Sequence, residues 1–106
     1  MSQVSMETIA EVFGVTVSNT ALDLEDIAGI EAADVSAADE AWIQVEAGGI
    51  RSRTDGGTLT TSAGWLTGIA DGRVPLVAGN VLVEAVQIIR DGADAATVNI
   101  GLYKWG

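Results

Sequence analysis

The chain of 106 residues carries 15 acidic and five basic side chains, a formal net charge of −10, and contains neither cysteine nor histidine. The length suits one domain with one hydrophobic core. The charge disfavours nucleic acid and membranes as direct partners, because phosphate backbones and anionic lipids repel an acidic surface. Without histidine or cysteine, the usual general base, the common nucleophile pairs and a disulfide framework are all missing. We therefore expect a domain that binds or builds rather than an enzyme.

The amino terminus predicts no export signal. Met1 to Thr8 contain neither a basic segment nor an apolar segment, so they do not look like a secretory signal or a transit peptide. No apolar run approaches the roughly 20 residues that a membrane-spanning helix needs. We expect a soluble protein that is made in a cytoplasm.

Residues 1–12 are interpreted as an N-terminal arm, and residues 13–106 as a single β domain. Ile9, Val12 and Phe13 have a spacing compatible with a helical turn or a loose arm. Residues 13–24 are rich in β-branched side chains and predict two short strands, with a turn at Asn19 and Thr20.

Residues 25–40 form an acidic stretch that predicts a short helix or a loop over the edge of the core, with Ile27, Ile30 and Val35 as its apolar positions. Residues 41–46 alternate as a half-exposed strand that places Ile43 and Val45 on one face and Trp42 on the other. A second strand follows at 50–53, and the glycines at 56–57 favour a sharp turn.

The second half of the chain predicts a loop, a hairpin and two long strands. Residues 58–63 are polar and read as a loop, and residues 64–77 predict a hairpin with Pro75 on an edge strand. Residues 81–90 predict a central strand. Residues 96–103 alternate strictly, with Val98, Ile100 and Leu102 inward. Seven or eight short strands between Gly, Asn and Asp turns are typical of an all-β sandwich or barrel.

Acidic side chains cluster twice in the chain, at Asp23, Glu25 and Asp26 and again at Asp34, Asp39 and Glu40. Neither cluster has the order of an EF-hand loop, so solvated loop charge is the favoured interpretation. The glycine pairs at 48–49 and 56–57 lack the Lys-Ser/Thr of a phosphate loop and are interpreted as turns. The sequence predicts no catalytic residue, no cofactor and no metal ion.

Three tryptophans and two arginines are the candidate protein-interface residues: Trp42, Trp65, Trp105, Arg51 and Arg53. Tryptophans on a β domain serve core packing, a protein interface or a platform for sugar rings, and all three roles stay open. Arg51 and Arg53 share one face of their strand, where they pair with nearby acids or grip carboxylates of a neighbouring subunit.

Two segments resemble small structural proteins of tailed phages. Residues 45–64 contain Ile50-Arg51-Ser52-Arg53-Thr54-Asp55-Gly56, which is similar to the pattern I-R-x-R-x-D-G followed by a Thr/Ser-rich loop and a glycine. Residues 88–95 resemble the closing I-R-x-G-A-D-A, before a last alternating strand with Tyr103. Leu59 stands where a proline is common in that loop, and the acidic insert before Trp42 is longer than usual.

The resemblance implies a single β-sandwich, jelly-roll-like, in a virion protein similar to capsid decoration (cement) or head-fibre proteins. Such a protein binds the major capsid protein on the capsid exterior, and a homotrimer is the expected oligomer. The N-terminal arm, the acidic insert, Trp42 and Trp105 are the expected contact regions. The alternatives are a carbohydrate-binding or adhesion module of a tail or head fibre and a head-tail or baseplate component. The acidic charge serves either solubility or docking to a basic partner.

Overall fold

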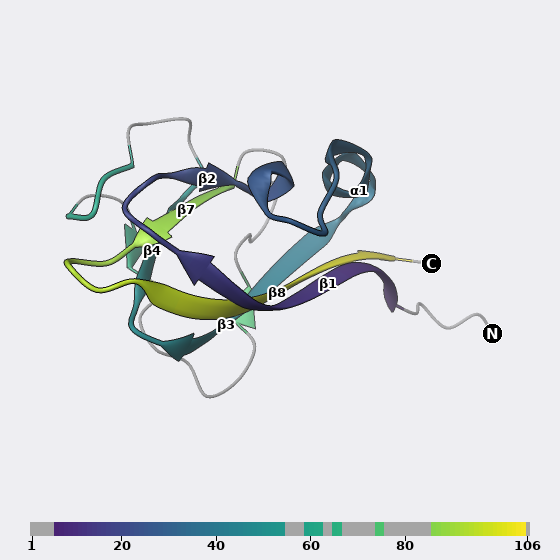
Figure 1. Ribbon diagram of the computed structural model, residues 1–106. Coiled ribbons are helices and arrows are strands. Elements are labelled where there is room, and N and C mark those ends of the chain that lie inside the picture. The colour runs from purple at the N-terminus through teal and green to yellow at the C-terminus, as the bar shows by residue number, and fades with distance from the viewer. Residues whose placement is uncertain (1–5, 55–58, 63–64, 67–73, 76–85, 106) are drawn as a thin grey trace.

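The computed structural model describes residues 6–54, 59–62, 65–66, 74–75 and 86–105 (Figure 1). Its strands are β1 (Met6–Val17), β2 (Leu22–Asp23), β3 (Glu40–Ala47), β4 (Ile50–Arg53), β5 (Trp65–Leu66), β6 (Val74–Pro75), β7 (Gln87–Arg90) and β8 (Ala96–Trp105). The short 3-10 helix η1 (Leu24–Asp26) and the helix α1 (Ala32–Ala37) lie between β2 and β3.

The strands form two antiparallel sheets of four strands each. Sheet A has the order β1-β8-β3-β6, and sheet B has the order β2-β7-β4-β5. The mostly β class predicted from the alternating pattern is therefore confirmed. No helix among the described residues is long and apolar enough to cross a membrane.

Both sheets contribute to one hydrophobic core. In sheet A, Ile43 of β3 lies opposite Ile100 of β8, and Val45 lies opposite Val98. All four side chains are at most 1% exposed, and Ile50 and Ile88 of sheet B join the same cluster with no exposed surface. The predicted inward residues of the strands at 41–46 and 96–103 are confirmed, because burial on one face dictates the register of a strand.

The prediction of an N-terminal arm over residues 1–12 is wrong for its described part. Residues 6–12 are the first half of β1, which pairs with β8 from Met6 opposite Trp105 to Val17 opposite Ala96. Ile9, Ala10 and Val12 pack against the core. The long, alternating β8 provides a partner for this segment, and the resulting burial outweighs its weak local preference.

The acidic stretch before β3 covers one end of the core, as predicted. Ile27, Ile30 and Val35 are all buried against the main cluster. Two acids there are structural: Asp26 Oδ2 accepts a hydrogen bond from the backbone N–H of Asp23, and Asp34 Oδ2 accepts one from that of Glu31 (3.0 Å each). These carboxylates satisfy amides at the starts of η1 and α1.

The hairpin predicted over residues 64–77 is wrong for the parts that are described. β5 pairs with β4 in sheet B, whereas β6 pairs with β3 in sheet A. β5 is the edge strand of sheet B and β6 is the edge strand of sheet A, so the two segments extend the two sheets that enclose the core. Pro75 does lie on an edge strand, where a residue without an N–H is tolerated.

The predictions of a central strand and of a loop are confirmed for their described residues. β7 lies in the interior of sheet B, and residues 59–62 form no strand or helix longer than a single bridge residue. The predicted turn at 55–57 and residues 81–85 of the predicted central strand lie outside the described residues.

Candidate functional site

Trp42 lies on the outer face of sheet A, opposite the core residues Ile43 and Val45, but it is not exposed. Its side chain is only 7% exposed, and its ring stacks on Tyr103 with a centroid separation of 6.0 Å and an interplanar angle of 27°. The indole also lies over Gly101, its cross-strand neighbour on β8. The expectation of an exposed Trp42 is therefore wrong, because the missing side chain at Gly101 leaves a space that the indole fills.

Arg51 and Arg53 lie together on the outer face of sheet B, since the alternating residues Ile50 and Ser52 are buried. Arg51 Nε donates a hydrogen bond to Asp91 Oδ1 (2.9 Å), and both side chains are less than one-third exposed. This contact favours the interpretation in which Arg51 pairs with an acid of its own chain.

The two remaining candidates lie at separate places in the fold. Trp105, at the end of β8, is 51% exposed, and its backbone N–H donates to Asp39 Oδ2 (2.9 Å). Trp65 lies on β5 opposite Ser52, and its side chain lies outside the described part of the structure. Because Trp42 and Arg51 lie on outer faces of different sheets, the five predicted interface residues do not form one site.

A bulge in β1 shapes a different site, which the sequence pattern did not predict. The register of β1 against β8 shifts between Val12 and Val15, and Gly14 within the bulge has a φ of 69°. The Gly14 N–H donates to Asn99 Oδ1 at 3.0 Å. A bulge of this kind bends the strand and changes which way its side chains point.

Asn99 holds the bulge in place from the middle of sheet A. Its side chain is nearly buried (7% exposed), and its Nδ2 donates to Gln44 Oε1 (3.1 Å) and Glu46 Oε1 (2.7 Å) on β3. The amide thus uses its acceptor for β1 and its donors for β3. Three strands are joined by one side chain, so the bulge is a fixed feature of the sheet.

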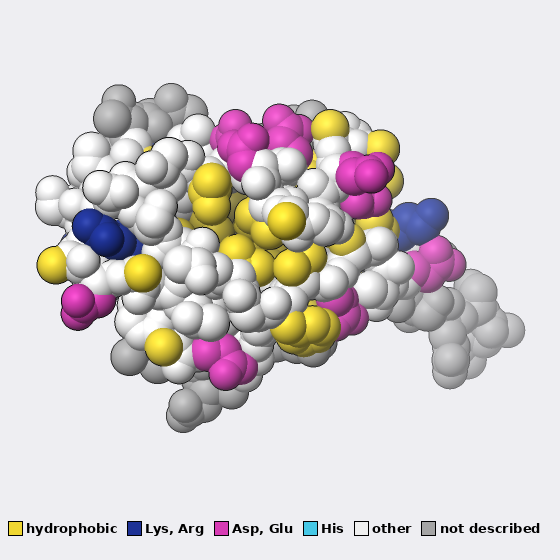
Figure 2. Space-filling view, viewed as in Figure 1, with side chains coloured by type: hydrophobic (Ala, Val, Ile, Leu, Met, Phe, Trp, Pro, Cys, Tyr) yellow, Lys and Arg dark blue, Asp and Glu magenta, His cyan; other side chains and the backbone are white. Residues whose placement is uncertain are grey.

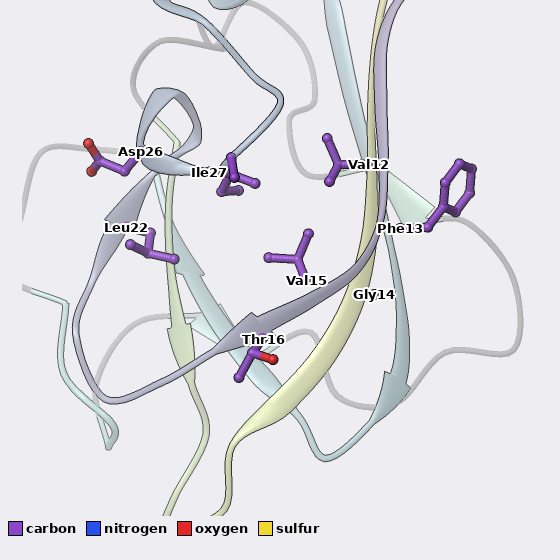
Figure 3. A pocket seen from close by; sticks show the side chains of 9 residues that line it. Val12, Phe13, Gly14, Val15, Thr16, Leu22, Asp26 and Ile27 are labelled. Carbon is purple, nitrogen blue, oxygen red and sulfur yellow. The ribbon is translucent and has the colours of Figure 1, made fainter.

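At the bulge, the Phe13 side chain points away from the side of β1 that carries Val12 and Val15 (Figure 3). Figure 3 shows Phe13 pointing away on one side of β1, while Val12 and Val15 point toward Leu22 and Ile27 on the other side. Phe13 is 61% exposed, whereas Val12 and Val15 are half-buried.

A groove runs between β1 and the segment formed by β2 and η1, where the two sheets have their edges (Figures 2 and 3). This edge groove has a volume of about 380 Å³. It is lined by Val12, Phe13, Gly14, Val15, Thr16, Leu22, Asp26, Ile27 and Ala28. Its size falls within the range of about 300–1,000 Å³ that is common for binding pockets.

The edge groove is apolar inside and acidic at its rim. Among the described lining residues, Asp26 is the charged one, and the neighbouring Glu25 is exposed. Figure 2 shows apolar side chains gathered in the centre of this face, with acidic side chains beside them.

The one signal of the bulge in the sequence was Gly14 inside a β-branched run, because an isolated glycine in a strand indicates a bulge.

The described acids do not gather as metal ligands. Within the described ranges, no group of three or more Asp or Glu side chains lies close enough together to hold a metal ion. Apolar contact with an acidic margin is thus the chemistry that the edge groove offers.

The chain was compared with family models, with curated proteins and with solved structures, and none of the three comparisons found a match.

Proposed function

We propose that this chain is a structural protein of a tailed-phage virion, a capsid decoration protein with a jelly-roll-like sandwich that binds the major capsid protein on the outside of the shell. The resemblance of residues 45–64 and 88–95 to phage structural proteins carries the proposal. In this role the protein stabilises the assembled shell, because a ligand that binds only the assembled state favours that state, and many copies add their effects.

The spatial relation of the two resembling segments supports the proposal. They are more than 20 positions apart in the chain, yet β4 and β7 pair directly, with Ile50 opposite Arg90 and Arg51 opposite Ile89. The Asp91 N–H donates to the Gly49 carbonyl (2.9 Å), and Arg51 bonds the Asp91 side chain. Residues 49–53 and 87–91, from the two resembling segments and the strands that carry them, therefore form one contiguous structural unit.

We place the capsid contact outside this unit, because Arg51 already pairs with Asp91 of its own chain. Phe13 and Trp105 are the large apolar side chains that stand exposed among the described residues. Exposed aromatic side chains of this kind are enriched at the centres of protein interfaces. We assign Trp105 to the contact surface, as the sequence predicted, and add Phe13.

The glycan-binding alternative receives less support. Trp42 and Tyr103 form the stacked aromatic pair of the described structure, and each is less than one-tenth exposed. A sugar ring needs an open aromatic face, which this pair does not offer. A glycan array probed with the chain and with its Trp65→Ala variant tests the alternative, and loss of a glycan signal in the variant would favour it.

Mass spectrometry of purified virions with copy counting tests the location. A decoration protein is present in hundreds of copies, in proportion to the major capsid protein, whereas a tail or baseplate component is present in a handful. A low copy number would contradict the proposal.

Virions that lack the protein test its role. We expect them to lose DNA at lower temperature and lower chelator concentration than complete virions, and added purified protein to restore their resistance. Trp105→Ala should restore less than the unchanged chain, while Ala93→Ser, a change at an exposed alanine between β7 and β8, should restore as much. Shells with unchanged resistance would refute the stabilising role.

We further propose a trimer as the bound form, which cross-linking on the shell would detect.

A further inference from the structure

We infer that the edge groove binds an extended peptide segment of another protein, with aliphatic side chains on one face and at least one lysine or arginine beside them. The inference rests on the proposed function only for the identity of the partner, the major capsid protein. The groove, its charge and its rigidity are properties of this chain alone.

Apolar side chains of the groove are incompletely buried. The central core residues Val98, Ile100 and Ile88 have no exposed surface, but Val12, Val15 and Leu22 remain half-buried although they point into the same interior. They belong to the last strands of sheets A and B on this side. Two or three additional aliphatic side chains would complete the core there, at roughly 25 cal/mol for each Å² of apolar surface removed from water.

The charge at the rim of the groove complements a basic segment. Asp26 lines the groove, Glu25 is exposed beside it, and the part of the chain that the structure describes places no lysine or arginine in the lining. A second copy of the chain, with its own net charge of −10, would bring acid against acid. A basic segment from another protein gains attraction at the rim and contact with the apolar floor.

The groove is formed before any partner binds. Asn99 joins the bulge of β1 to β3 through three hydrogen bonds, so Val12 and Val15 are already turned inward. Preorganisation lowers the entropic cost of binding. The same bulge disturbs regular pairing along β1, so side-chain insertion rather than a long continuous ladder should supply the affinity.

The test uses the full chain, labelled with 15N and with 13C methyl groups, and a capped heptapeptide of alternating valine and lysine as the probe. We expect the NMR signals of Val12, Val15, Leu22 and Ile27 to move on titration, while those of Ile50 on sheet B stay unchanged. Two control peptides accompany the probe. One has glutamate in place of lysine, and the other has the same composition with valines and lysines in two separate blocks, so it keeps the charge but not the apolar face.

Variants of the chain sharpen the test. Ala28→Phe places a large side chain in the groove and should weaken probe binding about tenfold or more. The same substitution at Ala33, an exposed alanine of α1 that does not line the groove, is the matched control and should leave binding unchanged. Asp26→Asn keeps an oxygen for the Asp23 N–H but removes the charge, and should weaken binding roughly two- to fivefold.

Four outcomes would overturn the inference: equal binding of the glutamate peptide, equal binding of the block peptide, equal loss in Ala28→Phe and Ala33→Phe, or signal changes outside the groove. Signal changes at the groove that depend on the concentration of the chain alone would also overturn it, in favour of a second copy.

Binding of the variants to shells separates this inference from the proposed function. If Ala28→Phe still decorates shells fully, the groove is not the shell contact and the decoration role stands. If the unchanged chain binds the probe but not shells, the decoration role fails and the groove stands.

Discussion

Gly101 explains why an outward-facing tryptophan is buried. Trp42 and Gly101 are direct cross-strand neighbours, and the indole covers the backbone where β8 has no side chain. Tyr103 stacks on the same ring. The alternating pattern around Trp42 correctly predicted its face of the strand. Its exposure depended on a glycine 59 positions away, which alternation within one strand does not reveal.

We expect Gly101→Ala to destabilise the protein by about 1–3 kcal/mol, the usual cost of overpacking, because a methyl group there would overlap the indole of Trp42. Urea unfolding measures the change. The double variant Gly101→Ala/Trp42→Leu should lose less than the sum of its two single variants, since the smaller side chain makes room. Strictly additive losses would contradict the assigned contact.

Asn99 is the residue whose substitution should most disturb the bulge. Asn99→Asp keeps the acceptor for the Gly14 N–H but turns the donor that serves Gln44 and Glu46 into a second acceptor. We expect a loss of roughly 2–3 kcal/mol at neutral pH, from lost hydrogen bonds and from repulsion between carboxylates. Urea unfolding between pH 4 and pH 8 measures it, and the loss should shrink at the acidic end, where the new carboxyl is protonated.

A second substitution controls for other effects of Asn99→Asp. Glu46→Gln in the same chain supplies an amide donor opposite the new carboxylate and removes the repulsion, so it should restore part of the stability at neutral pH. The same Glu46→Gln change in the unmodified chain should have a small effect, because Glu46 is exposed. Equal effects of Glu46→Gln in both backgrounds would refute the role of Asn99 as a donor to Glu46.

β1 shows how a long-range partner overrides local preference. Its first half lacks clear alternation, and the sequence predicted an arm there, yet it pairs with β8 over its whole length. The strand accommodates its uneven pattern through two register shifts, one between Thr8 and Ala10 and one at the Gly14 bulge. A register shift cannot be predicted from one strand alone, because it is a relation between two strands.

Two glycines with nearly equal backbone angles test this view of the bulge. Gly14 has a φ of 69° and an added Cβ would meet nothing within 4 Å, whereas at Gly48, with a φ of 72°, it would lie 3.0 Å from the Ala95 carbonyl oxygen. Gly14→Ala should therefore cost only the backbone strain, about 1–2 kcal/mol. Gly48→Ala should cost clearly more in the same unfolding assay. A smaller loss for Gly48→Ala would contradict the described packing of the turn between β3 and β4.

The charge of the whole molecule is a further determinant of stability. Fifteen acids against five bases leave an excess of negative side chains that repel one another. Among the described residues, Arg51 pairs with Asp91 and Lys104 with Glu7, and these ion pairs neutralise only a small part of the acidic charge. Such self-repulsion lowers the free energy of unfolding and is screened by salt.

We expect the melting temperature to rise by several degrees when NaCl is increased from about 0.02 M to about 0.5 M, because the Debye length falls from above 20 Å to below 5 Å over that range. Differential scanning calorimetry at constant pH measures the effect, and KCl serves as a control for ion identity. A melting temperature that falls with both salts would mean that attractive ion pairs outweigh the net repulsion.

The amino-acid pattern alone was enough to predict the mostly β class, the core faces of β3 and β8, and the apolar residues of the acidic stretch that cover one end of the core. These features depend on side chains a few positions apart, and alternation or turn chemistry records them directly. Four features became visible only in the folded chain: the pairing of β1 with β8, the assignment of β5 and β6 to different sheets, the burial of Trp42 and the edge groove. Each of these depends on which distant segments share a sheet or a face, and that choice is made by the burial available to the whole chain.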